Sequence, residues 1–331
     1  MPRIKLFPEL LAQSHLHYSD YVSGLPILEA ETAQLECGRA IFESLRIYGR
    51  DFVLSRLKLG PRTSSRVLFD PEWLVIVVPV SWRGDYIFNG LFAEPYDIFL
   101  SGGPYGYATS IAERDNIGIG LRKSRLRAAC AALAGLPDDE IEFEDVRLAL
   151  GPVRGARFHN RLAELIAASY YTPLGPGQFA LGDALERDTI SDIADLLLPY
   201  LIHRAPRIPA KLYALRVVRD AETSIGVRAL RAPCIEDLCE ASGIGQTWLN
   251  RCFNEIYGTS PMTYIRAHRL TTARNRFLDP GAPRASVKDV ALSLGFTSSG
   301  RFAAEYRDVF GENPSKTLLS RHSSQMSRPN G

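Results

Sequence analysis

A small set of polar side chains near the C-terminus has the types and spacing that could do chemistry. They form two groups, Gln246, Thr247, Asn250 and Arg251, and then Ser298, Ser299 and Arg301. Arginine matches the acceptors on guanine, asparagine and glutamine match adenine, and the threonine methyl packs against that of thymine. These types therefore indicate contact with the base edges of DNA. The alternative is an ordinary solvated helix face.

Both groups lie in chain segments, 235–257 and 287–310, that repeat one another. In each copy a glycine, Gly243 or Gly295, supplies the positive φ that ends a first helix in a tight turn. An apolar residue follows the glycine, and the next helix buries apolar or aromatic positions on one face. Each copy therefore predicts a helix-turn-helix unit, whose second helix can enter a DNA major groove.

The segment between the two copies predicts a single helix over Pro261–Leu278, with proline near its first turn. At about 1.5 Å per residue this helix is roughly 27 Å long. A rigid spacer of that size could present two recognition helices near one DNA turn, about 34 Å, apart. The spacer carries a set of cations that could contact phosphates or complement the helix dipole, Arg266, Arg269, Arg274 and Arg276.

The first 125 residues or so predict a β-rich fold. Short segments with β-branched and aromatic residues recur about every ten residues between Phe52 and Leu121, separated by Gly/Pro turns. This spacing is typical of a β-sandwich or barrel. Helical periodicity replaces it after Arg122, and the clearest apolar stripe runs through Ile190–Leu201.

Two prolines, Pro206 and Pro209, predict a stiff linker at 206–209. The expected fold class is α+β, with a β-barrel or jelly-roll-like domain that also carries helices, followed by an all-α double helix-turn-helix domain. The expected boundaries are 1–205 for the first domain, 210–322 for the second, and 323–331 for a flexible tail.

Composition and the remaining motifs exclude several classes of protein. The chain has 331 residues, 46% hydrophobic and 23% charged, the profile of a soluble globular protein. No apolar run approaches the roughly 18 residues of a membrane helix. The five scattered cysteines indicate reduced thiols of a cytoplasmic protein. His15-Leu16-His17 has no matching downstream Glu and His, and no nucleophile–base–acid set is present, so neither a metal, a cofactor nor an enzyme is expected.

The C-terminal residues resemble the signature of AraC/XylS-type transcriptional regulators over about 110 residues, from near Lys211 to near Arg321. The matching positions are Ser260-Pro261-Met262-Thr263-Tyr264-Ile265, Arg269-Leu270, Ala273-Arg274, Val290-Ala291, Gly295-Phe296, Phe302, Phe310-Gly311 and Asn313-Pro314. Arg269 and Arg274 belong to this signature, which implies that they hold the two units together. The N-terminal pattern resembles the cupin-like effector and dimerisation domain of many members.

This resemblance implies base contacts at Thr247, Asn250 and Arg251. Family members often carry a basic residue where Ala304 stands. The first unit is therefore expected to dominate base discrimination, while the second contributes more to phosphate positioning and DNA shape.

The predicted protein is a cytoplasmic, effector-responsive transcriptional regulator, and the resemblance favours activation. Its expected partners are double-stranded promoter DNA, RNA polymerase, a small-molecule effector and a second copy of the chain. The stripe through Ile193, Leu197 and Leu201 is the predicted dimer interface, with packing inside the domain as the alternative. The N-terminal aromatic residues could line an effector pocket or fill a core.

Two other functions remain open on the sequence. The chain could be a jelly-roll enzyme or small-molecule-binding protein with a helical appendage, although converging His, Asp or Glu residues are not found. Alternatively, it binds DNA while its N-terminal domain serves only oligomerisation.

Overall fold

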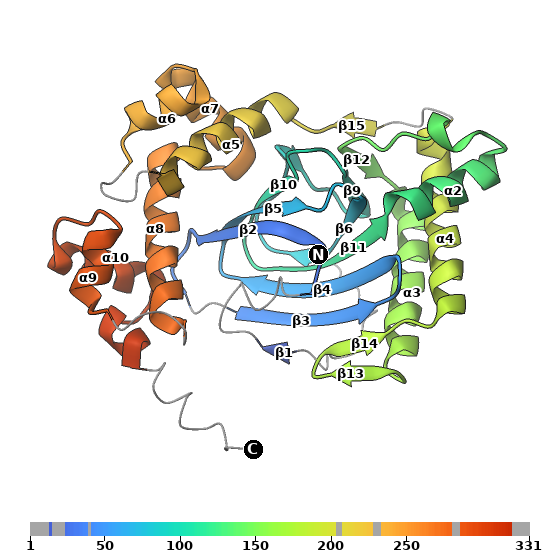
Figure 1. The fold of residues 1–331 in the computed structure, drawn as a ribbon, viewed down its shortest axis with the longest axis horizontal. Coiled ribbons are helices and arrows are strands. Elements are labelled where there is room, and N and C mark those ends of the chain that lie inside the picture. Colours follow the sequence, from blue (N-terminus) through green and yellow to red (C-terminus); the bar gives the residue numbers. More distant parts are fainter. Residues whose placement is uncertain are drawn as a thin grey trace.

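The computed structural model describes residues 13–14, 24–38, 41–202, 207–227, 233–279 and 285–319. A β-rich part lies between helices on one side and a helical domain on the other (Figure 1). The α+β class and the order of the two parts agree with the sequence prediction. None of the helices in these ranges combines the length and the apolar character needed to cross a bilayer.

Within the described residues the strands form two sheets. The larger one has the order β13-β14-β3-β4-β11-β6-β9-β12-β15, with β1 also paired to β3, and the smaller one has the order β2-β5-β10-β7-β8. The larger sheet contains β1 (Gln13–Ser14), β3 (Ile41–Tyr48), β4 (Phe52–Gly60), β6 (Trp73–Trp82), β9 (Asp97–Ser101), β11 (Arg114–Arg122), β12 (Val146–Ala149), β13 (Pro173–Gly175), β14 (Gln178–Ala180) and β15 (Arg207–Pro209). The smaller sheet contains β2 (Ile27–Gln34), β5 (Thr63–Phe69), β7 (Tyr86–Phe88), β8 (Leu91–Phe92) and β10 (Tyr107–Ile111).

The two sheets share an aromatic core. Tyr86 and Phe88 come from the smaller sheet and Phe99 from the larger one, and all three are buried in one cluster. The rings of Phe88 and Phe99 stack with centroids 4.6 Å apart, whereas Phe92 is exposed. Most of the aromatic residues of the strands therefore pack into a sandwich-like core, which is the second of the two roles that the sequence left open for them.

Helices cover the outer face of the larger sheet. They are α2 (Lys123–Ala134), the short 3₁₀ turn η1 (Asp138–Glu140), α3 (Gly151–Ser169) and α4 (Asp183–Leu201). Ile193 and Leu197 of α4 are 1% and 0% exposed within the core beneath these helices, and Leu201 packs against the same core. The prediction that this stripe is a dimer interface is therefore wrong, because the stripe is already buried inside the domain.

The predicted linker at 206–209 is partly a strand. Residues Arg207–Pro209 form β15, which pairs antiparallel with β12 at the edge of the larger sheet. Pro209 is tolerated there because an edge strand does not need every N–H for pairing. Pro206, the tail 323–331 and the histidines of His15-Leu16-His17 lie outside the described residues.

The C-terminal part consists of helices, as predicted. They are α5 (Leu212–Val227), α6 (Ile235–Ser242), α7 (Gln246–Tyr257), α8 (Pro261–Leu278), α9 (Val287–Ser293) and α10 (Ser299–Phe310). The two helix-turn-helix units are α6–α7 and α9–α10, and α8 runs between them (Figure 1). Gly243 and Gly295 have φ of 69° and 77°, so both turns use the left-handed conformation that glycine permits.

His159 of α3 gives the fold a testable pH dependence. It is 2% exposed, and neither ring nitrogen has a hydrogen-bond partner among the described residues. Burial lowers its pKa below the ordinary value of 6.5. As the pH falls below 6.5, the unfolded chain therefore binds more protons at this residue than the folded chain. The stability that depends on neutral, buried His159 is fully present above this pH and is lost as the pH falls.

We therefore expect the free energy of unfolding to fall by about 1.4 kcal/mol per pH unit over the interval in which only unfolded His159 is protonated. Urea unfolding between about pH 8 and pH 5 measures this slope. The His159→Phe variant, which keeps an aromatic ring but cannot titrate, should show a slope shallower by that amount. Equal slopes for the two proteins would contradict the role of His159.

Candidate DNA-binding surface

The first recognition helix, α7, has one buried and one exposed face. Leu249 and Phe253 are fully buried and anchor α7 in the core of the first unit. Because the buried positions recur at three- and four-residue spacing, the other face is left to solvent. Gln246, Thr247 and Arg251 are exposed there, and Asn250 is half-buried. All members of the first predicted group thus belong to one helix.

Two contacts fix the side-chain orientations of Asn250 and Arg251 on this face in the free protein. The Nδ2 of Asn250 donates to the backbone oxygen of Gln246 at 3.0 Å, so its amide must turn away from the helix to contact a base. The guanidinium of Arg251 lies 5.1 Å from the ring centroid of Trp248. Trp248 is 55% exposed and belongs to this surface. Sequence reasoning misses it, although its position three residues before Arg251 is the signal for such a contact.

The second recognition helix, α10, presents the other predicted group. Ser298 is its N-cap, and the hydroxyl accepts a hydrogen bond from the Arg301 backbone N–H at 3.3 Å. Ser299 and Arg301 are exposed, and the neighbouring Ala304 is exposed too. Since Ser298 uses its hydroxyl to cap the helix, Ser299 and Arg301 are the side chains freer to reach a nucleic acid.

Arg301 is already oriented by an acidic neighbour. Its Nε donates to Glu305 Oε1 at 2.9 Å, and the Nε of Arg266, on α8, donates to the other oxygen of Glu305 at 3.0 Å. Glu305 is largely buried, whereas the Arg301 side chain is 81% exposed. The result is a pair of exposed cations held on one carboxylate, at the junction of α8 and α10.

The other arginines of α8 fix the second unit. Arg269 donates from Nε to the Leu294 oxygen at 2.6 Å and lies 4.1 Å from the ring centroid of Phe296. Arg274 pairs with Glu312 at 2.9 Å. Both contacts join α8 to the turn or the end of the second unit, which is the structural role that the resemblance implies. Arg276 donates to Ser293 Oγ at 2.8 Å.

A capping box begins the second unit. Asp289 accepts hydrogen bonds from the Ser286 backbone N–H at 3.1 Å and from its hydroxyl at 2.7 Å, and the Asp289 N–H donates to Ser286 Oγ at 3.2 Å. The bonds from Ser286 lower the pKa of Asp289 below its usual value. The acid therefore stays ionised at the N-terminus of α9, where a negative charge is favourable.

The cysteines and acidic residues of the described segments do not gather into a metal site. Within those segments, no group of three or more His, Cys, Asp or Glu side chains is placed to hold an ion. Cys252 lies in the core of the first unit, and burial raises its pKa.

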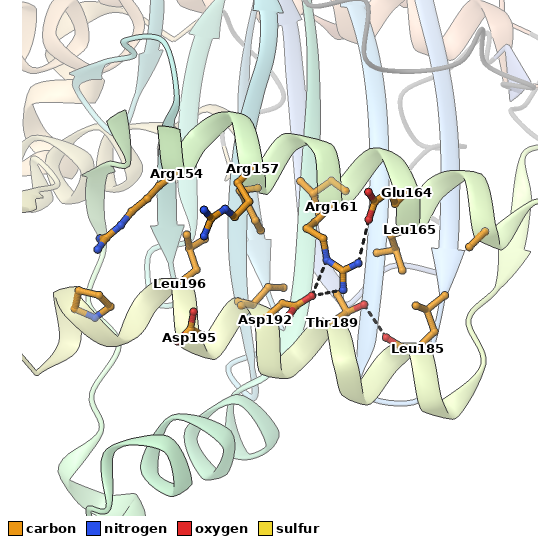
Figure 2. Close-up of a pocket in the computed structure, with 15 residues that line it drawn as sticks. Arg154, Arg157, Arg161, Glu164, Leu165, Leu185, Thr189, Asp192, Asp195 and Leu196 are labelled. Carbon is orange, nitrogen blue, oxygen red and sulfur yellow. Dashed lines mark hydrogen bonds and ion pairs between the residues drawn. The ribbon is translucent and has the colours of Figure 1, made fainter. Parts of the chain in front are cut away.

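A separate groove of about 680 Å³ lies between α3 and α4. Arg154, Arg157 and Arg161 line it from α3, and Asp192 and Asp195 line it from α4 (Figure 2). Arg161 Nη2 lies 2.6 Å from Asp192 Oδ2. This groove is on the opposite side of the larger sheet from the helix-turn-helix units, so it is no part of the candidate DNA-binding surface (Figure 1).

Comparison with known proteins places the similarity in the C-terminal domain. A family model described as "Helix-turn-helix domain" matches residues 238–320. The XylDLEGF operon transcriptional activator 1 of Pseudomonas putida is 42% identical over 87 residues, which cover 26% of this chain and 26% of that protein. Activator 2 of the same operon and organism is 38% identical over 103 residues, covering 31% of this chain and 63% of that protein.

A solved structure is also similar in sequence to part of this chain. The crystal structure of a probable AraC family transcriptional regulator from Rhodopseudomonas palustris is 38% identical, covering 32% of this chain and 96% of that chain, with a TM-score of 0.29. The chain thus spans about a quarter of the length of the first relative and less than two thirds of the second. The C-terminal helix-turn-helix domain of this chain is thus similar to those of AraC/XylS-type transcriptional regulators.

Proposed function

We propose that this protein is a non-enzymatic, sequence-specific DNA-binding regulator of transcription that reads two adjacent major-groove segments with α7 and α10. The observation that carries this proposal is the exposure of two polar helix faces on units joined by one continuous helix, α8. Helix-turn-helix recognition helices contact base edges through their N-terminal residues. Gln246, Thr247 and Arg251 occupy that part of α7, and Ser299 and Arg301 occupy it in α10.

The proposal is tested by selecting duplexes from a random-sequence pool with the full chain, followed by hydroxyl-radical footprinting. We expect two protected segments on one face of the DNA, about one helical turn apart. Salt-dependent binding of DNA without any sequence preference would indicate only non-specific electrostatic binding and would overturn the proposal.

Replacement of Arg301 by alanine is expected to lower affinity about equally for all binding sequences. The guanidinium stands on a helix whose neighbouring positions are small, so we assign it to phosphate rather than to a base. Loss of one phosphate contact should reduce the slope of log affinity against log salt by about one. Titrations of the selected duplex at several salt concentrations measure both effects. A change in sequence preference with an unaltered slope would instead assign Arg301 to a base.

The N-terminal part is proposed to bind a small-molecule effector and a second copy of the chain, and thereby to control activation by RNA polymerase. With Ile193 and Leu197 buried, the exposed sides of α3 and α4 are the surface proposed for the second copy. The groove between them carries both signs of charge, so the same surface on a second copy offers it opposite charges. Sedimentation of the wild type and of a variant with Arg154 and Arg157 reversed to glutamate tests this surface. Such a regulator would act in the cytoplasm.

A further inference from the structure

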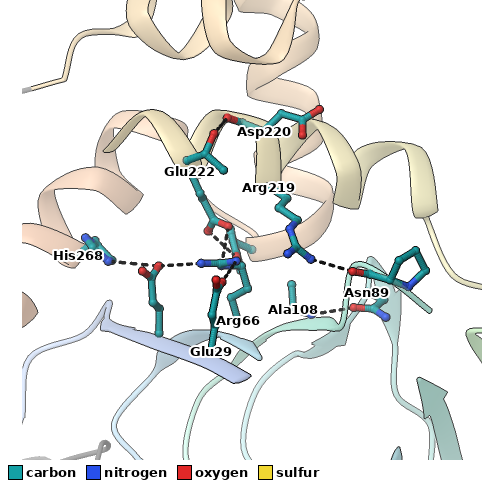
Figure 3. Close-up of polar contacts among 12 residues, drawn as sticks. Glu29, Arg66, Asn89, Ala108, Arg219, Asp220, Glu222 and His268 are labelled. Atoms are coloured by element: carbon teal, nitrogen blue, oxygen red, sulfur yellow. Dashed lines mark hydrogen bonds and ion pairs between the residues drawn. The ribbon is translucent and has the colours of Figure 1, made fainter. Parts of the chain in front are cut away.

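The smaller sheet and the helix-turn-helix domain meet at a buried ion pair centred on Arg66 (Figure 3). The Nε of Arg66, on β5, lies 3.1 Å from Oε2 of Glu222, on α5, and the two side chains are 11% and 2% exposed. Tyr257 of α7 donates its hydroxyl to the other Glu222 oxygen at 2.7 Å. A cation of the β-rich part therefore compensates a carboxylate inside the core of the first unit.

A second carboxylate extends this contact to α8. Glu31, on β2, lies 3.4 Å from Arg66 Nη2 and 3.5 Å from Nε2 of His268, which is on α8. The hydrogen bond from His268 is the largest influence lowering the pKa of Glu31, to about 2. Glu31 is thus charged at neutral pH and bridges the sheet to the spacer helix.

The end of the same strand reaches the second unit. The backbone N–H of Gln34 donates to Thr271 Oγ1 of α8 at 3.0 Å, and its side-chain Nε2 donates to the Val309 oxygen of α10 at 3.1 Å. The N–H of Gly38 donates to the same Val309 oxygen at 3.1 Å. Gln34 is only 4% exposed, so these contacts are shielded from water.

Next to β5, Arg62 makes the corresponding contact with the first unit. Its Nη2 lies 3.3 Å from the backbone oxygens of Tyr257 and Gly258, at the C-terminal end of α7. One sheet therefore holds the C-terminal ends of both recognition helices, α7 through Arg62 and α10 through Gln34.

These contacts leave the base-reading residues uncovered. Gln246, Thr247 and Arg251 at the start of α7, and Ser299 and Arg301 at the start of α10, are exposed while the sheet is docked. A lid that blocked DNA would cover these positions. Docking at the opposite ends of both helices instead fixes their relative placement.

We infer that the smaller sheet is a brace that sets the two helix-turn-helix units in a DNA-competent arrangement, so that docking of the β-rich part promotes binding to the two-segment site. This inference rests on the proposed function, because it concerns the geometry of the same reading surface. Units held in the correct spacing bind the second segment at a high effective concentration, and loose units lose that advantage.

The test uses the full chain and a duplex selected by the wild type, with a second duplex in which the segment protected by α10 is scrambled. One variant is Gln34→Ala, which removes the side-chain link to α10. The other is the paired change Arg66→Met with Glu222→Gln, which removes both charges of the buried ion pair and leaves the more exposed Glu31 its contact with His268. The control is Arg125→Met, which breaks the 3.3 Å ion pair of α2 with Asp51, away from the interface and from the groove between α3 and α4. Circular dichroism melting verifies that each variant is folded.

If docking of the smaller sheet sets the arrangement of the two units, both interface variants should bind the two-segment duplex about tenfold or more weakly than the wild type. They should also lose footprint protection at the α10 segment. Their affinity for the scrambled duplex should equal that of the wild type, and the control should match the wild type on both duplexes. Tighter DNA binding by the interface variants would show that docking of the sheet hinders DNA binding. Unchanged binding would show that the interface does not contribute to DNA recognition. Either result overturns the inference. If the wild type selects no duplex at all, the proposed function fails first and separately.

Discussion

Truncation of Phe302 to alanine is expected to destabilise the second helix-turn-helix unit by about 3–5 kcal/mol, since it removes a fully buried ring from a small core. Phe302 is 0% exposed and lies among Phe277, Phe296 and Tyr306, with ring centroids 6.4, 4.9 and 5.7 Å away. These residues come from α8, from the turn after α9, and from α10. The ring therefore joins α8, the turn after α9 and α10 in one core.

Hydrogen exchange resolved along the chain measures this effect. In Phe302→Ala the amides of α9 and α10 should exchange faster, while those of α6 and α7 keep their protection, because the two units have separate cores. The footprint should shrink to the segment read by α7. The Phe302→Leu variant, which retains most of the buried volume, should show a smaller change in the same amides. Uniform acceleration in both units would mean that they unfold together.

The parts of the fold that the sequence predicts well are those governed by local signals. The bounds predicted for α8 and the predicted end of the first unit at residue 257 agree with the structure, because a proline begins α8 and a glycine follows α7. Gly243 and Gly295 have the predicted positive φ since no other residue adopts it at so little cost. The apolar stripe of α7 likewise predicts which face of the helix is exposed, but it does not single out Trp248 as part of that face.

Pairing between segments that are distant in the chain could not be predicted from the sequence. Arg207–Pro209 reads as irregular chain, and only its neighbour β12, some sixty residues earlier, makes it a strand. The stripe through Ile193 and Leu197 shows that one face of α4 must be buried, but not whether the partner is its own domain or a second copy. Burial in the domain core decides between the two.

The interface around Arg66 carries no sequence signal at all. Arg66 and Glu222 are separated by more than 150 positions, and neither belongs to a motif. An arginine in a strand and a glutamate in an amphipathic helix each fit an exposed surface equally well. Their pairing depends on how two domains pack, which composition and periodicity do not determine.

Replacement of Arg251 by alanine is expected to cost about 1–3 kcal/mol of DNA-binding free energy and to relax sequence preference at a single base pair. Arg251 is exposed on the outward face of α7, and its long side chain is the one best suited to two acceptors of a guanine. Competition binding against duplexes that carry each single base-pair change measures the preference position by position. The matched control is Arg276→Ala, in the same domain but on α8, where the side chain bonds Ser293. Equal loss of affinity for every duplex would reassign Arg251 to the phosphate backbone.

Trp248 could act in one of two ways: it orients the Arg251 guanidinium, or it contacts DNA itself. The guanidinium lies over the indole ring in the free protein, and such an exposed cation–π contact stabilises one orientation by about 0.5–1 kcal/mol. If Trp248 only orients Arg251, Trp248→Leu should weaken preference at the same base pair by about that amount, and it should have no further effect when Arg251 is already alanine. A second base pair losing preference in Trp248→Leu would mean that the indole contacts DNA itself. The reading surface of α7 would then be one side chain wider than its polar residues indicate.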